Sequence, residues 1–166
     1  MILGMSLATF TTVHVILSLI GIVSGIIVVL GMLGGRHLGG LTEVFLATTV
    51  LTSVTGFLFP FTSLLPSHIV GIISLVVLAF TLLALYAFQL AGAWRWVYVA
   101  TAVIALYLNA FVGVVQAFQK LALLQPLAPT QSEPPFLVAQ VLVLIVFLLA
   151  GFLALRAYHP EPMKPA

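Results

Sequence analysis

Apolar residues fill five long segments of the chain, and short groups of glycine, proline, serine and charged residues separate them. A helix that crosses a membrane needs about 20 mostly apolar residues. Each segment meets that length, so the pattern predicts an all-α integral membrane bundle of five transmembrane helices. We expect one domain over residues 1–159 and a disordered tail at 160–166. The predicted spans cover about residues 8–33, 41–61, 67–89, 94–118 and 135–158.

The composition indicates that lipid is the solvent of this fold. Of the 166 residues, 63% are hydrophobic and 5% are charged, whereas a soluble domain carries about 25% charged residues. The net charge of +2 comes from scattered residues with no basic patch, which excludes a nucleic-acid partner. The absence of cysteine excludes disulfides, thiol redox chemistry, iron–sulfur clusters and thiolate metal sites.

The basic residues predict the orientation, because Lys and Arg collect on the cytoplasmic side of membrane proteins. Four of them fall at one end of the predicted bundle: Arg36, Arg95, Arg156 and Lys164. Only Lys120 falls at the other end. We therefore expect the N-terminus and the loop at 119–134 to lie outside the cell membrane and the C-terminus to be cytoplasmic.

Small and polar residues mark the packing faces, because helices in lipid associate through close backbone approach and hydrogen bonds. One stripe of the first helix comprises His14, Ser18, Gly21 and Gly25, and one of the fourth comprises Ala102, Ala105, Asn109, Gly113 and Gln116. We expect the GxxxG spacing of Gly21 and Gly25 to serve a contact inside the bundle. The threonines of the second helix are expected to bond to carbonyls of their own helix.

Two histidines are the main candidates for chemistry inside the membrane. No Asp, Glu, Lys or Arg falls at the middle of a span, which argues against a proton-coupled transporter. His14 and His68 lie within about one turn of the outer helix ends, at similar depth. Other polar side chains that fall toward the same side are Asn109, Gln116, Gln140 and Glu133. The pattern predicts a ligand site near the outer face. We expect His37 and His159, in the cytoplasmic turn and tail, to be solvated.

The occupant of this site is open between several alternatives. A bis-His haem b would use His14 and His68 as iron ligands, and a metal ion would take Glu133 in addition. A quinone or small lipid-like ligand would be held by the histidines and the nearby amides under an aromatic lid such as Phe136. In the structural alternative, each histidine is bonded only to a neighbouring hydroxyl or carbonyl.

Three stretches of the chain carry a resemblance to a known family. They read LATTVLTSVTGF at 46–57, LPSHIVGIIS at 65–74 and LAPTQSEPPF at 127–136. They resemble those of a family of small bacterial polytopic membrane proteins whose activity is uncharacterised, and the similarity covers nearly the whole chain. The resemblance implies a multi-pass protein of the bacterial inner membrane, with the outer face in the periplasm. It implies no activity, cofactor or site residue.

The leading functional expectation is a small membrane protein with a ligand site near the periplasmic face. His14 and His68 would bind haem or a metal ion there, for use in electron transfer. The alternative is a non-catalytic accessory subunit that packs against a larger membrane complex, and a small-solute carrier is a third reading. Expected partners are the lipid bilayer and other membrane subunits or a second copy. The chain has no nucleophile elbow, zincin helix or phosphate loop, which argues against a protease or a nucleotide enzyme. Whether the protein is an enzyme of another kind stays open.

Overall fold

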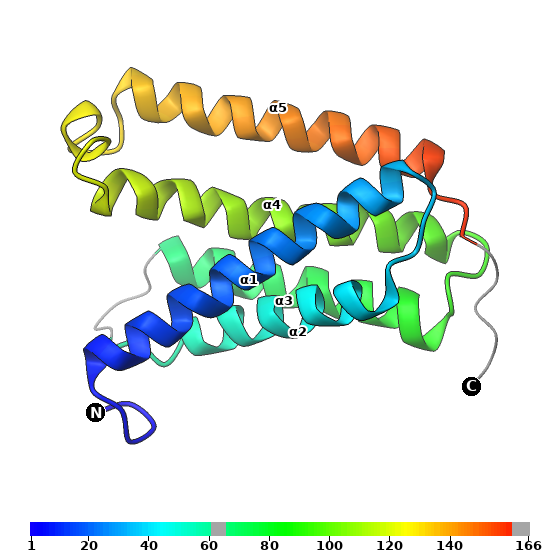
Figure 1. The fold of residues 1–166 in the computed structure, drawn as a ribbon, viewed down its shortest axis with the longest axis horizontal. Coiled ribbons are helices and arrows are strands. Elements are labelled where there is room, and N and C mark those ends of the chain that lie inside the picture. Colours follow the sequence, from blue (N-terminus) through cyan, green and yellow to red (C-terminus); the bar gives the residue numbers. More distant parts are fainter. Residues whose placement is uncertain (61–65, 161–166) are drawn as a thin grey trace.

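The computed structural model describes residues 1–60 and 66–160, and within these ranges the chain forms an all-α bundle (Figure 1). Its helices are α1 (Leu7–Leu33), α2 (Gly39–Gly56), α3 (Pro66–Leu82), α4 (Trp94–Lys120) and α5 (Pro134–Ala157). A π-helical turn, η1 (Leu83–Ala87), extends α3, and a 3-10 turn, η2 (Gln125–Leu127), lies between α4 and α5. Apart from Pro160, the tail predicted at 160–166 lies outside the described residues.

Four of the helices are long and apolar enough to cross a membrane: α1, α3 together with η1, α4 and α5. This confirms the expectation of a helical, multi-pass membrane protein. The second predicted span, about 41–61, is a helix, but α2 has 18 residues and is not among the four. It is about 27 Å long, slightly short of a hydrocarbon core of about 30 Å, and it is rich in threonine and glycine. A fifth crossing therefore stays a prediction.

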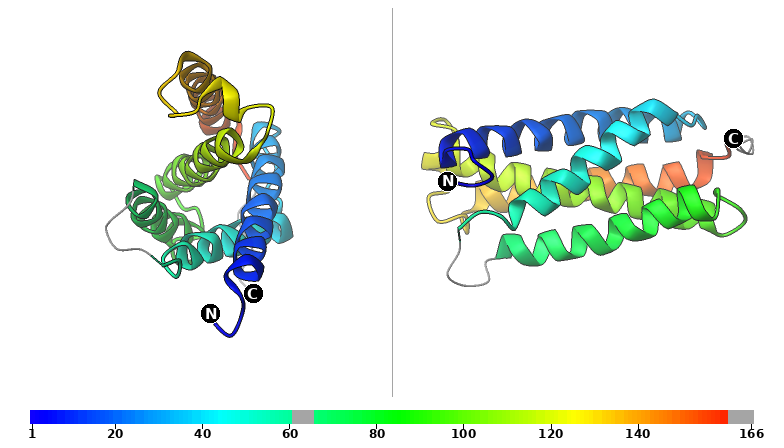
Figure 2. Two further views of the ribbon diagram at one scale, coloured as in Figure 1. Left: turned by 90° about the vertical axis from the view of Figure 1, so that its left-hand side faces the viewer. Right: turned by 90° about the horizontal axis from the view of Figure 1, so that it is seen from below.

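Helices α1 to α4 form a ring, and α5 packs outside it against α4 and α1 (Figure 2). Helix α4 contacts every other helix of the bundle. The N-terminus lies at one end, together with the α4–α5 connection, and the α1–α2 turn and the end of α5 lie at the other (Figure 1). We call these the N-terminal end and the C-terminal end of the bundle.

The small-residue stripe of α1 packs inside the bundle, as the sequence predicts. A Cβ atom on Gly25 would lie 2.6 Å from Leu106 Cδ1 and 2.8 Å from the Phe45 ring. At Gly21 it would lie 3.1 Å from Asn109 Nδ2 and from Thr49 Oγ1. The two glycines let α1 approach α2 and α4 more closely than any larger residue would allow. The GxxxG spacing thus serves an internal contact.

Three of the five threonines of α2 bond to carbonyls of their own helix, as expected, whereas the buried hydroxyls of Thr42 and Thr52 have no hydrogen-bond partner. Thr48 and Thr49 donate to Val44 and Phe45 at 2.6 and 2.7 Å, and Thr55 donates to Leu51 at 2.7 Å. Such bonds hide polar groups within the helix, so a threonine-rich helix can pack among apolar neighbours.

The main hydrophobic core occupies the C-terminal half of the bundle. Its fully buried members include Met32 of α1, Phe45 of α2, Leu78 of α3 and Leu106 of α4. A second, smaller cluster of buried apolar residues lies in the N-terminal half, between α4 and α5. It comprises Phe118, Ala128 and Phe136. The ring of α1 to α4 therefore has no apolar cluster of comparable size near its N-terminal end, where Phe10 is fully buried against Phe59.

Candidate functional site

A cavity of about 540 Å³ lies between α1 and α4 at the N-terminal end of the bundle. We call it the groove. Its α1 wall consists of Thr11, His14, Val15, Ser18, Leu19 and Ile22, and its α4 wall of Val112, Gly113, Gln116, Ala117 and Lys120. Gly56, Phe59, Pro60, Ser67, His68 and Leu121 complete the lining. Because Val15 and Leu19 are exposed, the groove also opens to the side of the bundle, where lipid would lie.

The groove exists because α1 and α4 diverge toward the N-terminal end. They touch at Gly25 and Leu106, and Ser18 still reaches α4 by donating to Asn109 Oδ1 at 3.0 Å. Beyond this point α1 crosses away from α4 (Figure 1), and two of the α4 residues that line the gap, Gly113 and Ala117, have little or no side chain. Small side chains on diverging helices leave the wedge between them unfilled.

A second cavity of about 100 Å³ continues from the groove into the ring of α1 to α4, and we call it the recess. His14, Ser18, Gly56, Ser67, His68 and Val112 line both cavities. Four hydroxyl side chains lie in the deeper lining of the recess, among apolar residues such as Phe57 and Leu108: Thr49, Thr52, Ser53 and Ser74. Thr52 Oγ1 is buried there with no hydrogen-bond partner. An unpaired buried hydroxyl is costly, which makes the recess suited to a polar group or water.

His14 is held in one orientation by α2. Its Nδ1 lies 2.8 Å from Thr55 Oγ1, and the Phe59 ring meets the imidazole edge-on at 5.2 Å. Thr55 already donates its single hydroxyl proton to the Leu51 carbonyl at 2.7 Å. Its oxygen must therefore accept from His14 Nδ1–H, which leaves Nε2 of the neutral ring as a hydrogen-bond acceptor or a ligand atom.

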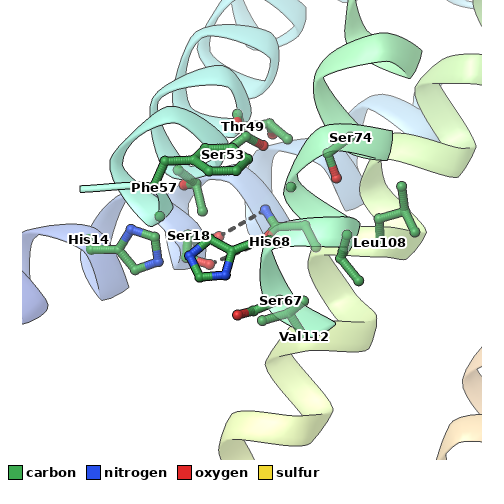
Figure 3. A pocket seen from close by; sticks show the side chains of 15 residues that line it. His14, Ser18, Thr49, Ser53, Phe57, Ser67, His68, Ser74, Leu108 and Val112 are labelled. Atoms are coloured by element: carbon green, nitrogen blue, oxygen red, sulfur yellow. Dashed lines mark hydrogen bonds between the residues drawn. The ribbon is translucent and has the colours of Figure 1, made fainter. Parts of the chain in front are cut away.

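His68 lies buried in the first turn of α3, with its ring 5.7 Å from the ring of Phe57. Phe57 fits against α3 because Gly71 has no side chain: a Cβ there would lie 3.0 Å from Phe57 Cζ. Figure 3 shows His14 and His68 directed into the recess from α1 and α3. The structure thus brings the two predicted histidines to one cavity.

The predicted amides divide between two places. Asn109 bonds Ser18 and lines the recess, and Gln116 lines the groove, so both join the histidines. Gln140 does not: its Nε2 donates to the Phe111 carbonyl at 3.2 Å, in the contact between α4 and α5. Helix α5 covers a face of α4 that is turned away from the groove (Figure 2). Gln140 is therefore a packing residue in this structure.

Phe136, the predicted aromatic lid, does not cover the histidines. Phe136 packs edge-on against Phe118 at 5.5 Å and lines neither cavity, so it forms no lid over them. Phe59 is the aromatic residue that lies against His14 instead. No pattern in the sequence marks Phe59, because it lies after the threonine-rich helix α2 and on none of the predicted packing stripes.

Glu133 is committed to its own loop. Its carboxylate accepts from the Thr130 hydroxyl at 2.8 Å and from the amides of Thr130 and Ser132 at 3.1 Å. Desolvation would raise the pKa of this carboxyl, but the hydrogen bonds outweigh it and lower the pKa. The predicted metal set of His14, His68 and Glu133 is not assembled. Among residues 1–60 and 66–160, no group of three or more His, Cys, Asp or Glu could hold a metal ion.

The C-terminal end holds a different polar cluster, formed by His37, Tyr98 and Tyr158. His37 Nδ1 lies 2.7 Å from the Tyr158 hydroxyl, and both tyrosines are fully buried. Burial lowers the pKa of His37, and burial together with Tyr98 raises that of Tyr158. His37 is half-exposed and not fully solvated as expected, because Tyr158 packs over the α1–α2 turn and bonds its ring. His159 is exposed, as expected.

No family model, curated protein or solved structure matches this chain.

Proposed function

We propose that this chain is a multi-pass protein of the bacterial inner membrane that binds a small amphiphilic molecule in the groove. The N-terminal end of the bundle would face the periplasm, α2 would form a short fifth crossing, and the ligand would enter from the outer leaflet. The orientation rests on the distribution of basic residues. The binding function rests on one observation: a cavity of about 540 Å³ with an apolar, laterally open wall and a polar floor at His14 and His68.

The size and lining of the groove favour an amphiphile over other ligands. Sites for small molecules commonly measure about 300–1,000 Å³ and combine apolar walls with a few polar groups. Val15, Leu19 and Ile22 supply the apolar wall, and they fall on one face of α1. The polar groups concentrate near the N-terminal end and the recess. A molecule with one apolar chain and one polar head would place its chain against the apolar wall and its head against these polar groups.

The proposal is tested by closing the groove. Gly113→Phe would place a large ring in the gap, and Leu19→Trp would narrow it from the opposite wall. A Cβ on Gly113 would meet only Ile22 Cδ1, at 3.4 Å, so Gly113→Ala is a matched control that should fold and bind normally. Native mass spectrometry of the full chain in mild detergent should show an added single-chain amphiphile on the wild type and on Gly113→Ala. Equal binding by both blocking variants would refute the proposal.

Haem is a second candidate, favoured by the arrangement of His14. A histidine that ligates a metal usually donates its other ring nitrogen to a nearby acceptor, and Thr55 accepts from His14 Nδ1 in this way. His68 would supply the other axial ligand of a bis-His haem, and the haem would carry single electrons. Absorption spectra of the purified protein, oxidised and reduced, decide this candidate: a Soret band lost in both His14→Ala and His68→Ala supports it, and its absence excludes it.

An accessory role in a larger complex is the third candidate, and α5 favours it. Only 6% of its most hydropathic window is buried in the bundle, the lowest share of the four candidate spans. A partner subunit or a second copy could pack there in place of lipid. Co-purification in mild detergent tests this role: a constant partner that is lost when α5 is changed supports it, and a monomer with bound amphiphile opposes it.

A further inference from the structure

We propose that the groove selects an amphiphile with an anionic head, and that Lys120 forms the anion subsite. This inference rests on the proposed function and names the class of ligand. Among the residues that the structure describes, Lys120 is the one Lys, Arg, Asp or Glu that lines the groove. It is the last residue of α4, at the open N-terminal end, and its side chain is exposed.

No carboxylate neutralises Lys120 within the described residues. The chain has three acidic residues in all. Glu133, at the same end of the bundle, accepts hydrogen bonds from Thr130 and Ser132. Glu43 lies in α2 near the C-terminal end. Glu161 lies outside the described residues. A cation that has no partner at the edge of an apolar groove is complementary to an anion that arrives with an apolar chain.

The spacing along α4 aligns the subsite with the rest of the groove. Gly113, Gln116 and Lys120 lie at i, i+3 and i+7, so they share one face of the helix. Gln116 can donate a hydrogen bond from its amide beside the ammonium of Lys120. Gly113 lies two turns deeper, opposite Ile22, where the apolar chain would run. The head would therefore lie at the aqueous end of the groove and the chain toward the bundle centre.

The neutral form of His14 assigns the charge selectivity to Lys120. In the neutral imidazole, His14 donates Nδ1–H to Thr55 Oγ1, so the other ring nitrogen accepts and does not donate. An anion gains nothing from an acceptor, whereas a hydroxyl on the head group would. The acid group of the ligand should therefore sit at Lys120 and Gln116, and any hydroxyl at His14.

Matched ligands test this inference, because they differ only in the head group. Native mass spectrometry of the full chain would compare dodecanoate, dodecanol and dodecyltrimethylammonium. A second pair, lysophosphatidylglycerol and lysophosphatidylcholine, would distinguish a phosphate head from a carboxylate. We expect dodecanoate to bind about tenfold more tightly than dodecanol, the size of effect of a hydrogen bond to a charged group. The cationic ligand should bind most weakly.

Variants of Lys120 provide the decisive comparison. Lys120→Gln should remove the preference for the anion and leave dodecanol binding unchanged, and Lys120→Arg should retain the preference. If Lys120→Gln keeps the tenfold preference, or if the wild type binds acid and alcohol equally, the inference is overturned. In that case Gly113→Phe still decides the proposed function: loss of binding to both ligands would uphold the groove, and unchanged binding would refute both proposals.

Discussion

The two ends of the bundle contain the same kinds of polar residue but use them in opposite ways. At the C-terminal end, His37 and Tyr158 bond each other over a packed apolar core. At the N-terminal end, His14 and His68 face cavities lined by hydroxyls, amides and small side chains. The two ends differ in how densely the space around the polar residues is packed. Large apolar side chains surround them in the C-terminal half, whereas the cavities of the N-terminal half are lined in part by Gly56, Gly71 and Gly113. A polar residue packs against its neighbours where its surroundings are filled, and it lines a cavity where they are not.

The largest expected effect comes from overfilling the packed half. Gly25→Leu would drive a side chain into Leu106 and Phe45, where even a Cβ lies closer than 3 Å. Overpacking a close contact costs about 1–3 kcal/mol and more where backbone must move, so we expect about 3 kcal/mol. Thermal unfolding in detergent measures the loss. Gly113→Ala, on the groove, should change the melting temperature little, and an equal loss in both variants would show that the halves are packed alike.

The polar cluster at the C-terminal end should contribute less to the free energy of unfolding than the apolar core does. Tyr158→Phe removes the hydroxyl that bonds the half-buried ring of His37, at a cost of about 0.5–1.5 kcal/mol. Tyr86→Phe is the matched control, because Tyr86 is exposed. The same melting experiment checks both. If Tyr158→Phe melts with the wild type, the cluster does not hold the C-terminal end closed.

The same cluster predicts how stability changes with pH. Burial lowers the pKa of His37 in the folded chain from its ordinary value of 6.5, so the unfolded chain binds the extra proton first. Stability should be full above about pH 6.5 and should fall as the pH drops below it. In His37→Gln this decline should be shallower. Melting curves between pH 7.5 and 5 test the sign, and a protein stabilised by acid through His37 would contradict it.

The smallest expected change in stability comes from a substitution in the recess. Thr52→Val removes a buried hydroxyl that makes no hydrogen bond, so the variant should be as stable as the wild type or more stable by less than about 1 kcal/mol. Thr49→Val is the control, since the Thr49 hydroxyl donates to Phe45 at 2.7 Å. A clear loss of stability in Thr52→Val would mean that its hydroxyl has a partner, such as a bound water.

The sequence predicts best what depends on periodicity. The bounds of α1, α4 and α5 and the packing stripe through Gly21 and Gly25 follow from apolar runs and from the spacing of small residues. The same reasoning predicts that His14 and Asn109 both face the interior of the bundle, since each falls on the packing face of its helix.

What the sequence could not predict depends on which helices are neighbours. Gln140 and Phe136 share the predicted depth of the histidines, but α5 packs on another face of α4 and takes them away. His37 becomes half-buried because Tyr158, which is distant in sequence, packs over the α1–α2 turn and bonds its ring. The groove itself is a gap, and no residue pattern marks the place where two helices diverge.

The most direct test of the groove is photolabelling of the full chain in lipid nanodiscs with a diazirine-bearing fatty acid. If the groove binds amphiphiles, labels should concentrate on its walls, at Val15, Leu19 and Ala117, and excess unlabelled fatty acid should suppress them. Labelling of Leu148 on the exposed face of α5 should not be suppressed, because that side chain meets bulk lipid. Equal, unsuppressed labelling of α5 and of the groove would contradict the proposed binding site.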